Sequence, residues 1–421
     1  GCGKLKDENE GPKNCQKLRL AALLHDVGHY PLSHPGEQVF QWVDFDQNVP
    51  DVTKNRGSND FKKNLLLNAE KKHESPTAEH ERLSKLIITH ENSEIRKILE
   101  HEKYDPEEIA RIFNAEDTQN PFHVQLMSST LDCDRLDYML RDAKSTGTSY
   151  GIVDLDYILR NLKWDKKNEL ICFTPKAITA IEHFITNRYF SYNIIYHKTT
   201  VGFELMAKAL FYCMVMDKDF KDGGKYPEIV HSFADIEEKI KNDCDFLMNF
   251  NDEYFWYYLD IYKKRNDNKL IQKLIENLYK RKPLRPIYEI KTVETKTEGY
   301  YDEKYTILTK CLINNSDFLK KLDELGLDLG YISIAERKIK FEEMSHSIEL
   351  EDTQKTESPD YLKLVKILQK DEIRELVTLS GSIVKTLSQY KPCISRLYAL
   401  VDKNSDEEKE LKSIVGEILT Q

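Results

Sequence analysis

The chain has 421 residues, and its 62 Lys and Arg residues against 72 Asp and Glu residues give a formal net charge of −10. This balance excludes a generally basic nucleic-acid coat, although it allows a local basic pocket. Only 16 Gly and 13 Pro residues interrupt the chain, which favours a mostly helical protein. The longest clear apolar run, residues 209–216, is far shorter than the roughly 18 residues that span a bilayer, so we expect no membrane partner.

The eight cysteines are spread over the whole length, and no two have CxxC spacing. Several lie in apolar runs, where a reduced thiol packs like a small hydrophobic side chain. We therefore expect a reducing, intracellular compartment, with the cytoplasm as the predicted location and the nucleus left open.

The first part of the chain predicts an all-helical core that extends to about residue 285. Residues 1–14 are polar and predict a flexible lead-in, residues 44–74 predict a long loop or insertion, and residues 170–174 predict a short strand closing a hairpin. Helical spacing of apolar residues is found in 18–27, 78–100, 106–113, 124–143, 177–216 with a break near 196–200, 236–248 and 270–281.

After Lys282 the pattern changes. Residues 283–305, 329–341 and 394–401 are rich in Val, Ile, Tyr and Thr and predict strands, whereas residues 346–359 form a polar, acidic linker. We therefore predict two domains, a helical core over 1–285 and a smaller mixed α/β lobe over 286–421.

Three histidines, His25, His29 and His34, lie within ten residues of one another at the end of an apolar helical stretch. His25 is followed directly by Asp26, and neutral imidazole together with carboxylate suits Zn, Fe, Mn or a similar divalent ion. On a helix these two neighbours lie about 100° apart, so that both can reach one ion. The alternative is a plain helix end with a Gly cap at Gly28.

A second constellation contains Asp134, Asp137 and Tyr138, which share one helical face by their spacing of three and four residues. A carboxylate on an otherwise apolar helix needs an ion, an arginine or a helix N-terminus as its partner. Arg135 and Arg141 are available for plain salt bridges, so this segment taken alone favours a structural role.

Together, His25-Asp26 with Gly-His-x-Pro-x-Ser-His and the distant Asp-x-Asp-Arg-x-Asp-Tyr closely resemble the HD-domain metal-dependent phosphohydrolases. The nearer relatives are deoxynucleoside triphosphate triphosphohydrolases, including the branch with a sterile-alpha-motif domain. The resemblance implies an HD-domain helical bundle in which His25, Asp26 and Asp134 bind a divalent ion (Mn, Fe, Mg or Zn). The family's first ligand, an upstream histidine, is expected before Gly1.

The same resemblance implies roles for further residues. His80-Glu81 is similar to the family's His-Glu helix, and Tyr196-His197-Lys198 is similar to a segment near the nucleotide, with Arg188 as the arginine counterpart. His34 is the predicted acid/base, supported by His29, His80 and Glu81. The predicted substrate contacts are Arg135, Tyr138, Asp142, Arg188, Tyr196 and Lys198.

The implied reaction is hydrolysis of a dNTP to a deoxynucleoside and triphosphate, in a homo-oligomer that in some relatives binds an allosteric nucleotide. Two alternatives stay open: an HD phosphohydrolase acting on another nucleotide, and an inactive HD protein that binds nucleotide or nucleic acid as a regulator. Nucleic acid has weak support, because the one basic patch with an aromatic neighbour is Lys280–Lys282 with Tyr279 and Arg285.

Overall fold

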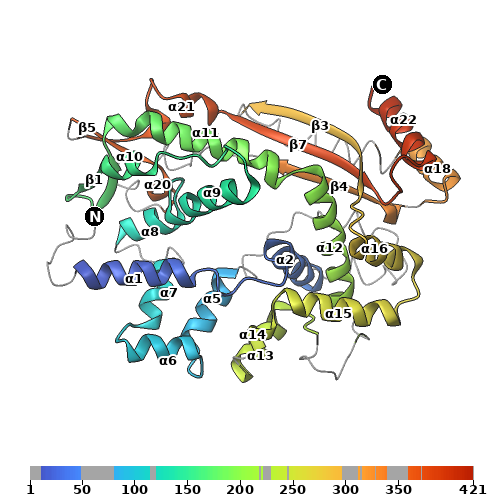
Figure 1. Cartoon of the computed structure of the whole chain (residues 1–421), viewed down its shortest axis with the longest axis horizontal. Helices are drawn as coiled ribbons and strands as arrows, with labels where there is room; N and C mark the ends of the chain where they lie inside the picture. Colours follow the sequence, from blue (N-terminus) through green and yellow to red (C-terminus); the bar gives the residue numbers. More distant parts are fainter. Residues whose placement is uncertain are drawn as a thin grey trace. The chain divides into compact units, whose positions relative to one another are not determined.

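The computed structural model in Figure 1 shows a mainly helical chain with a few short strands, which confirms the predicted fold class. By their internal contacts the residues group into two compact units. Unit 1 comprises Gly1–Val27, Ser84–Ile195 and Ile339–Lys391, and unit 2 comprises Gly28–Leu83, Tyr196–Lys338 and Pro392–Gln421. The structure describes residues 11–48, 80–113, 120–217, 220, 229–243, 246–295, 312, 315–327, 329–338, 359–370 and 372–420.

Unit 1 contains eight of its described helices from the N-terminal half of the chain and two short ones from residues 359–387. Helix α9 shows why they begin and end where they do: the Asp132 side chain accepts a hydrogen bond from Arg135 N at its start, and Gly147 adopts the left-handed conformation (φ 69°) at its end. The helices are α1 (Gly11–Leu24), α5 (His80–Thr89, shared with unit 2), α6 (Glu94–His101), α7 (Pro106–Phe113), α8 (Pro121–Ser128), α9 (Cys133–Thr146), α10 (Leu155–Arg160), α11 (Ile178–Ile195), α20 (Pro359–Lys363) and α21 (Ile383–Leu387).

A four-stranded sheet of order β1-β2-β5-β6 completes unit 1. Strands β1 (Leu162–Asp165) and β2 (Leu170–Phe173) form an antiparallel hairpin, which confirms the predicted strand near residue 170. The strands β5 (Lys366–Gln369) and β6 (Glu372–Glu375) were not predicted, and β5 pairs with β2 in parallel through Phe173 and Ile367.

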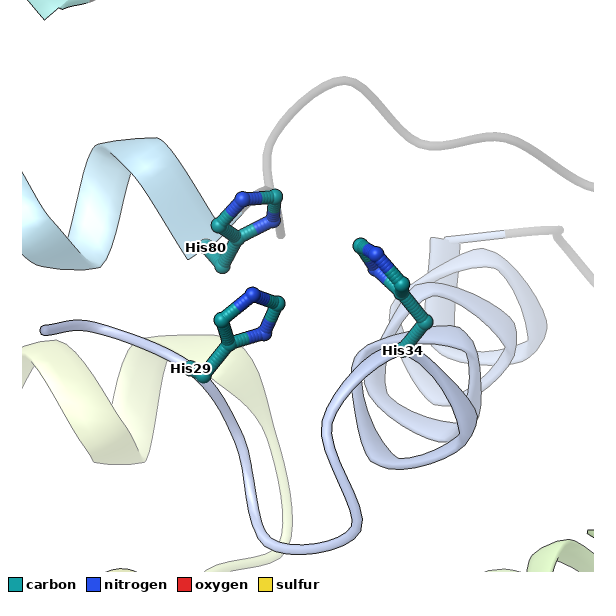
Figure 2. Close-up of side chains that lie close together, drawn as sticks. All are labelled: His29, His34 and His80. Atoms are coloured by element: carbon teal, nitrogen blue, oxygen red, sulfur yellow. The ribbon is translucent and has the colours of Figure 1, made fainter. Parts of the chain in front are cut away.

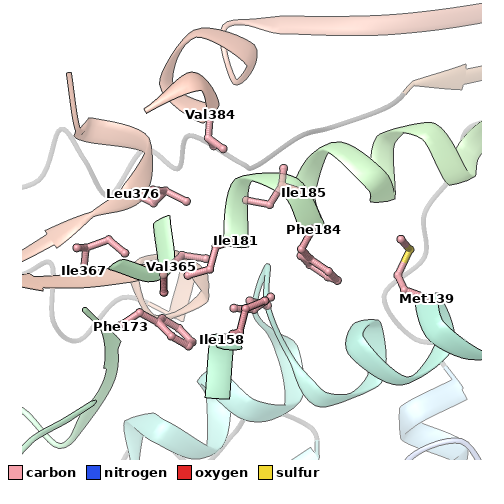
Figure 3. Packing of buried hydrophobic residues seen from close by; sticks show 12 residues of the cluster. Met139, Ile158, Phe173, Ile181, Phe184, Ile185, Val365, Ile367, Leu376 and Val384 are labelled. Carbon is pink, nitrogen blue, oxygen red and sulfur yellow. The ribbon is translucent and has the colours of Figure 1, made fainter. Parts of the chain in front are cut away.

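The main core of unit 1 lies between the sheet and helices α9, α10 and α11 (Figure 3). Phe173 and Ile367 from paired strands contact the buried side of α11, where Ile181, Phe184 and Ile185 point. Burial of such side chains contributes roughly 1.5–3 kcal/mol each relative to exposure. This core therefore fixes α9, the helix that carries Asp134.

In unit 2 the apolar helix α12 (Lys198–Met216) packs against α2 (His34–Asn48), α15 (Asp252–Arg265) and α16 (Lys269–Tyr279). Among the described residues α12 alone is long and apolar enough to cross a membrane, but 67% of its most apolar window is buried inside the protein, as in a core helix. The remaining helices are α13 (Phe233–Asn242), α14 (Phe246–Asn249), α18 (Ser316–Glu324) and α22 (Asp406–Thr420).

Unit 2 also holds a three-stranded sheet of order β3-β7-β4, formed by β3 (Arg285–Thr295), β4 (Ile332–Lys338) and β7 (Tyr390–Ala399). The antiparallel β4–β7 register pairs Ile332 with Ala399 and Lys338 with Cys393. The strands predicted after Lys282 are therefore confirmed within the described residues.

Several predicted boundaries were wrong. The polar lead-in gives way to helix α1 at Gly11, α1 ends at Leu24, and the helical spacing over 78–100 and 124–143 belongs to two helices in each case. Helix α2 continues to Asn48, so the predicted loop does not start at residue 44, and residues 49–74 lie outside the described ones. The two compact units each combine several segments of the chain. The predicted domain boundary at residue 285 stays a prediction.

The described cysteines are in two states. Cys133, Cys172, Cys213 and Cys393 are free thiols, whereas Cys15 is disulfide-bonded.

Candidate metal centre and histidine cluster

His25 and Asp26 lie in a turn directly after α1, and not on the helix as predicted. The turn is held by backbone bonds from His25 N to Ala21 O (3.0 Å) and by the Ser84 hydroxyl, which donates to His25 O (2.5 Å). The ring Nδ1 of His25 lies 2.9 Å from Ala22 O. Because a carbonyl oxygen only accepts, Nδ1 carries a proton, which leaves Nε2 as the ring atom available to a metal ion.

Two carboxylates converge on this Nε2 atom within unit 1. Asp26 Oδ1 lies 3.1 Å from it and Asp134 Oδ1 lies 4.0 Å from it. The Asp134 side chain projects from the first turn of α9. The N-cap residue Asp132 fixes where this helix starts. The structure therefore brings together His25, Asp26 and Asp134, the three residues predicted as metal ligands, although they are far apart in the sequence.

The donor set fits a divalent cation. One ligand atom from each of the three residues lies within 4.8 Å of the other two. A lone pair and two carboxylates that face one another repel unless a cation or a proton lies between them. The bond from His25 Nδ1 to a backbone carbonyl is the usual outer contact that orients a metal-bound histidine. One imidazole and two carboxylates therefore suit a Mn, Fe, Mg or Zn ion.

Unit 2 gathers His29, His34 and His80 in one cluster (Figure 2). The rings of His29 and His80 are stacked, with centroids 4.1 Å apart and an angle of 8° between their planes. His34, at the start of α2, faces both rings. Its ring centroid lies 5.0 Å from that of His29 and 5.4 Å from that of His80. The cluster thus unites all three histidines that were predicted to be catalytic.

A buried glutamate, Glu37, orients two of these rings. Its Oε2 lies 2.9 Å from His34 Nδ1, and its Oε1 lies 3.4 Å from His80 Nδ1 and 3.3 Å from the His80 backbone N–H. Since an ionised carboxylate only accepts, both rings carry their proton on Nδ1 and turn Nε2 elsewhere. Burial on its own raises the pKa of Glu37, but the hydrogen bonds from His34 and His80 outweigh it and lower the pKa to about 2. Glu81 Oε2 lies 3.3 Å from His80 Nδ1.

Ring geometry separates this cluster from the first one. The ligand atoms of the three histidines lie within 4.8 Å of one another, which by distance alone suits an ion. An imidazole lone pair lies in the ring plane, however, and the planes of His29 and His80 are almost parallel. One ion cannot lie in both planes at bonding distance. The stacked pair instead offers parallel polar edges, an arrangement suited to neighbouring oxygens of an extended anion such as a phosphate chain.

The predicted substrate contacts of unit 1 lie on α9 and α11. Tyr138 is half-buried; burial raises its pKa to about 12, although the Arg188 guanidinium acts in the opposite direction. Arg188 is buried and its Nη1 lies 3.4 Å from Thr130 O. Arg135 is ion-paired with Asp132 and donates to Ser129 O (2.6 Å), while Asp142 is exposed. Tyr138 and Arg188 therefore interact electrostatically, whereas Arg135 already has structural partners.

The predicted contacts of unit 2 lie at the start of α12. The His197 side chain caps this helix by accepting from Thr199 N (3.3 Å), and Lys198 is exposed. Strand β7 holds the same segment: Arg396 donates to Tyr196 O (2.5 Å) and the Tyr398 hydroxyl donates to Lys198 O (3.1 Å).

The basic patch proposed for nucleic acid is largely neutralised. Lys280 pairs with Glu276, Lys282 with Asp402 at 3.8 Å, and Arg285 with the buried Glu408 at 3.2 Å. These ion pairs favour a structural role for the patch over binding to a nucleic-acid backbone.

Sequence reasoning missed Glu37 and Asp132. Glu37 follows His34 by three residues at the start of a helix, and this spacing was the available signal. Asp132 has a recognisable N-cap position three residues before Arg135.

The family model of the HD domain matches residues 2–119. The match contains His25-Asp26 and the three clustered histidines, whereas Asp134 lies beyond it. Residues 2–119 thus have the expected likeness to an HD domain.

The chain is also similar to other proteins, in sequence and in structure. An uncharacterized protein of Mycoplasma pneumoniae, the MG461 homolog, is 28% identical over 324 residues, covering 72% of this chain and 67% of that protein. The uncharacterized protein YwfO of Bacillus subtilis is 27% identical over 59% of this chain. The chain spans about half (48%) of the length of YwfO. The crystal structure of a phosphohydrolase from Bacteroides thetaiotaomicron has the same fold, with a TM-score of 0.54 and 20% identity, over 94% of this chain and 81% of that one.

Proposed function

From the HD domain at residues 2–119, we propose that this chain is a metal-dependent phosphohydrolase that converts a dNTP to a deoxynucleoside and triphosphate. The convergence of His25 Nε2, Asp26 and Asp134 is the observation that carries the proposal. A divalent ion held by these three residues supplies an activated water near neutral pH and neutralises phosphoryl oxygens. The likeness to a phosphohydrolase structure supports the reaction class.

The residues of unit 1 prepare the ligands before any ion binds. Ala22 O keeps the proton of His25 on Nδ1, and the capped start of α9 holds Asp134 on the same side. Preorganised ligands lose little conformational freedom on binding, which favours affinity and fixes the geometry.

The histidine cluster provides proton transfer and hydrogen bonds to phosphate. Glu37 fixes the tautomer of His34, as a carboxylate does for a catalytic histidine. We assign His34 as the acid/base at the scissile phosphate, and His29 and His80 as partners of phosphate oxygens; because Glu37 occupies His80 Nδ1, His80 donates to phosphate through Nε2 as an imidazolium.

A triphosphate substrate is favoured by the number of groups suited to anions. The parallel edges of His29 and His80 match successive phosphoryl oxygens, and Lys198 is exposed at the start of α12. Tyr138, with its pKa raised to about 12, stays protonated and is assigned to the sugar, together with Asp142.

Product analysis tests this proposal. The purified chain is incubated with Mn²⁺ and each dNTP, and the products are separated by ion-exchange chromatography. We expect equal amounts of deoxynucleoside and triphosphate. The double variant His25→Ala/Asp26→Ala should lose at least 100-fold in kcat with unchanged helix content.

Asp137→Ala is the matched control, because Asp137 lies on α9 beside Asp134 but is ion-paired with the exposed Arg141. It should retain activity. Full activity of the double variant would refute the metal assignment, whereas release of monophosphate or pyrophosphate would replace the dNTP triphosphohydrolase reaction by another phosphohydrolase reaction.

A further inference from the structure

The turn between His29 and His34 has a strained backbone. Leu32 (φ 67°) and Ser33 (φ 61°) are consecutive residues in the left-handed region, although neither is glycine. Side chains with a Cβ atom are sterically disfavoured in this region, so the surroundings must hold the turn in this form. Its shape fixes the spacing of two rings in the histidine cluster.

Packing holds the two ends of this turn. The buried Tyr30 ring packs against the rings of Phe40 and Phe250, with ring centroids 5.3 Å and 6.0 Å away. The Ser33 backbone N–H donates to Tyr30 O at 2.7 Å. On the other side Gly36 lies against the carbonyl of Pro31, where a Cβ atom would approach the oxygen to 1.9 Å. These contacts anchor the residues before and after Leu32.

Asp252 holds the middle of the turn. The Leu32 backbone N–H donates to Asp252 Oδ1 at 2.7 Å, a contact between residues 220 positions apart in the sequence. Asp252 is the first residue of α15, but the cap of that helix is Asn251, whose side chain accepts from Glu253 N. The Asp252 carboxylate is therefore directed at the strained residue and does not serve as the cap.

We propose that Asp252 is a positioning residue for the histidine cluster: its bond to Leu32 N–H holds the left-handed turn that sets His34 opposite the stacked His29 and His80 rings. This inference rests on the function proposed above for the cluster. A shift of about 1 Å in a catalytic group can cost on the order of 100-fold in rate.

Kinetics of Asp252 variants give the first test. Asp252→Ala should lower kcat by about 10- to 100-fold with little change in KM, because the proton-transferring ring moves while the other substrate contacts remain. Asp252→Asn keeps an acceptor oxygen and should stay within about threefold of the parent chain. Glu253→Ala, which removes the neighbouring exposed carboxylate of the same helix turn, should leave kcat unchanged.

A rescue by glycine gives the second test. Glycine enters the left-handed region without steric cost, so Leu32→Gly removes the need for the Asp252 bond. In the Asp252→Ala/Leu32→Gly double variant kcat should return to within about threefold of Leu32→Gly alone. Additive losses, or an unchanged kcat in Asp252→Ala, would overturn the proposal.

Imidazole NMR of histidine-labelled protein separates this inference from the function on which it rests. Asp252→Ala should shift the ring signals of His29 and His34 and leave that of His231, whose Nδ1 bonds to Val215 O in the same unit. Shifted rings without any hydrolysis by the parent chain would refute the proposed function alone. Unshifted rings in an active enzyme would refute the role of Asp252 alone.

Discussion

At the residue scale, Glu37 combines burial with ionisation. Its side chain is 9% exposed, and it accepts hydrogen bonds from two imidazoles and one backbone N–H. A buried carboxylate without such partners would become neutral. Its charge therefore depends on the histidines it orients, and their tautomers depend on its charge.

This coupling predicts a pH-dependent stability. The folded pKa of Glu37, about 2, lies below the ordinary value of 4.5, so its contribution is complete above pH 4.5 and is lost as the pH falls toward 2. Between pH 6 and pH 3.5 the free energy of unfolding should fall by about 1 kcal/mol more in the parent chain than in Glu37→Gln. Urea unfolding across this range checks the difference. A gap between the two proteins that does not change with pH would contradict the role of Glu37.

Residue types and short spacings predicted much of the candidate site. The pair His25-Asp26 and the face shared by Asp134 and Tyr138 follow from local sequence. Two features do not: His80 joins His29 through contacts across 51 positions, and the His25 tautomer depends on Ala22 O. Spacing describes one element at a time, whereas these features arise only where elements meet.

At the element scale, the start of α2 depends on a close backbone approach. Gly36 lies in the first turn of this helix, and any side chain there would collide with Pro31 O. The helix carries His34 and Glu37, so its position bears directly on the histidine cluster.

Gly36→Ala should therefore destabilise the protein by roughly 2 kcal/mol or more, because the backbone must move to relieve the clash. Gly416→Ala in α22 is the control: a Cβ atom there meets nothing within 4 Å, and alanine favours a helix over glycine by about 0.5–1 kcal/mol. Thermal unfolding of both variants measures the effects. Equal melting temperatures would show that the start of α2 tolerates a side chain.

Helix breaks were the weakest part of the sequence-based prediction. Apolar spacing continues from α8 into α9, yet α8 ends at Ser128 and a new helix starts after its cap, Asp132. Apolar spacing indicates which face of a helix is buried. It does not indicate a break between two helices that bury the same face. A polar residue at a cap position is the more informative signal in such segments.

At the scale of the whole molecule, the two units interleave along the chain. Strands β5 and β6 join a hairpin nearly 200 positions earlier, and no local pattern predicts such pairing. In unit 2 the C-terminal helix α22 is tied to β3 by Arg285, which pairs with the buried Glu408 across 123 positions.

Removal of the Arg285–Glu408 ion pair should lower the free energy of unfolding. Arg285→Ala should destabilise the protein by about 2 kcal/mol, since Glu408 loses one partner of its buried charge. Lys280→Ala, from the exposed Lys280–Glu276 pair, should change stability by less than about 0.5 kcal/mol. Chemical denaturation compares them, and equal effects would mean that Arg285 acts only as a surface charge.

The proposed function depends on one divalent ion held by His25, Asp26 and Asp134. The most direct measurement is Mn²⁺ binding to the purified chain, followed by electron paramagnetic resonance, for the parent protein, Asp134→Ala and Asp137→Ala. We expect one bound ion in the parent protein and in Asp137→Ala, with affinity at least 10-fold lower in Asp134→Ala. Equal affinity in Asp134→Ala and the parent protein would contradict this expectation.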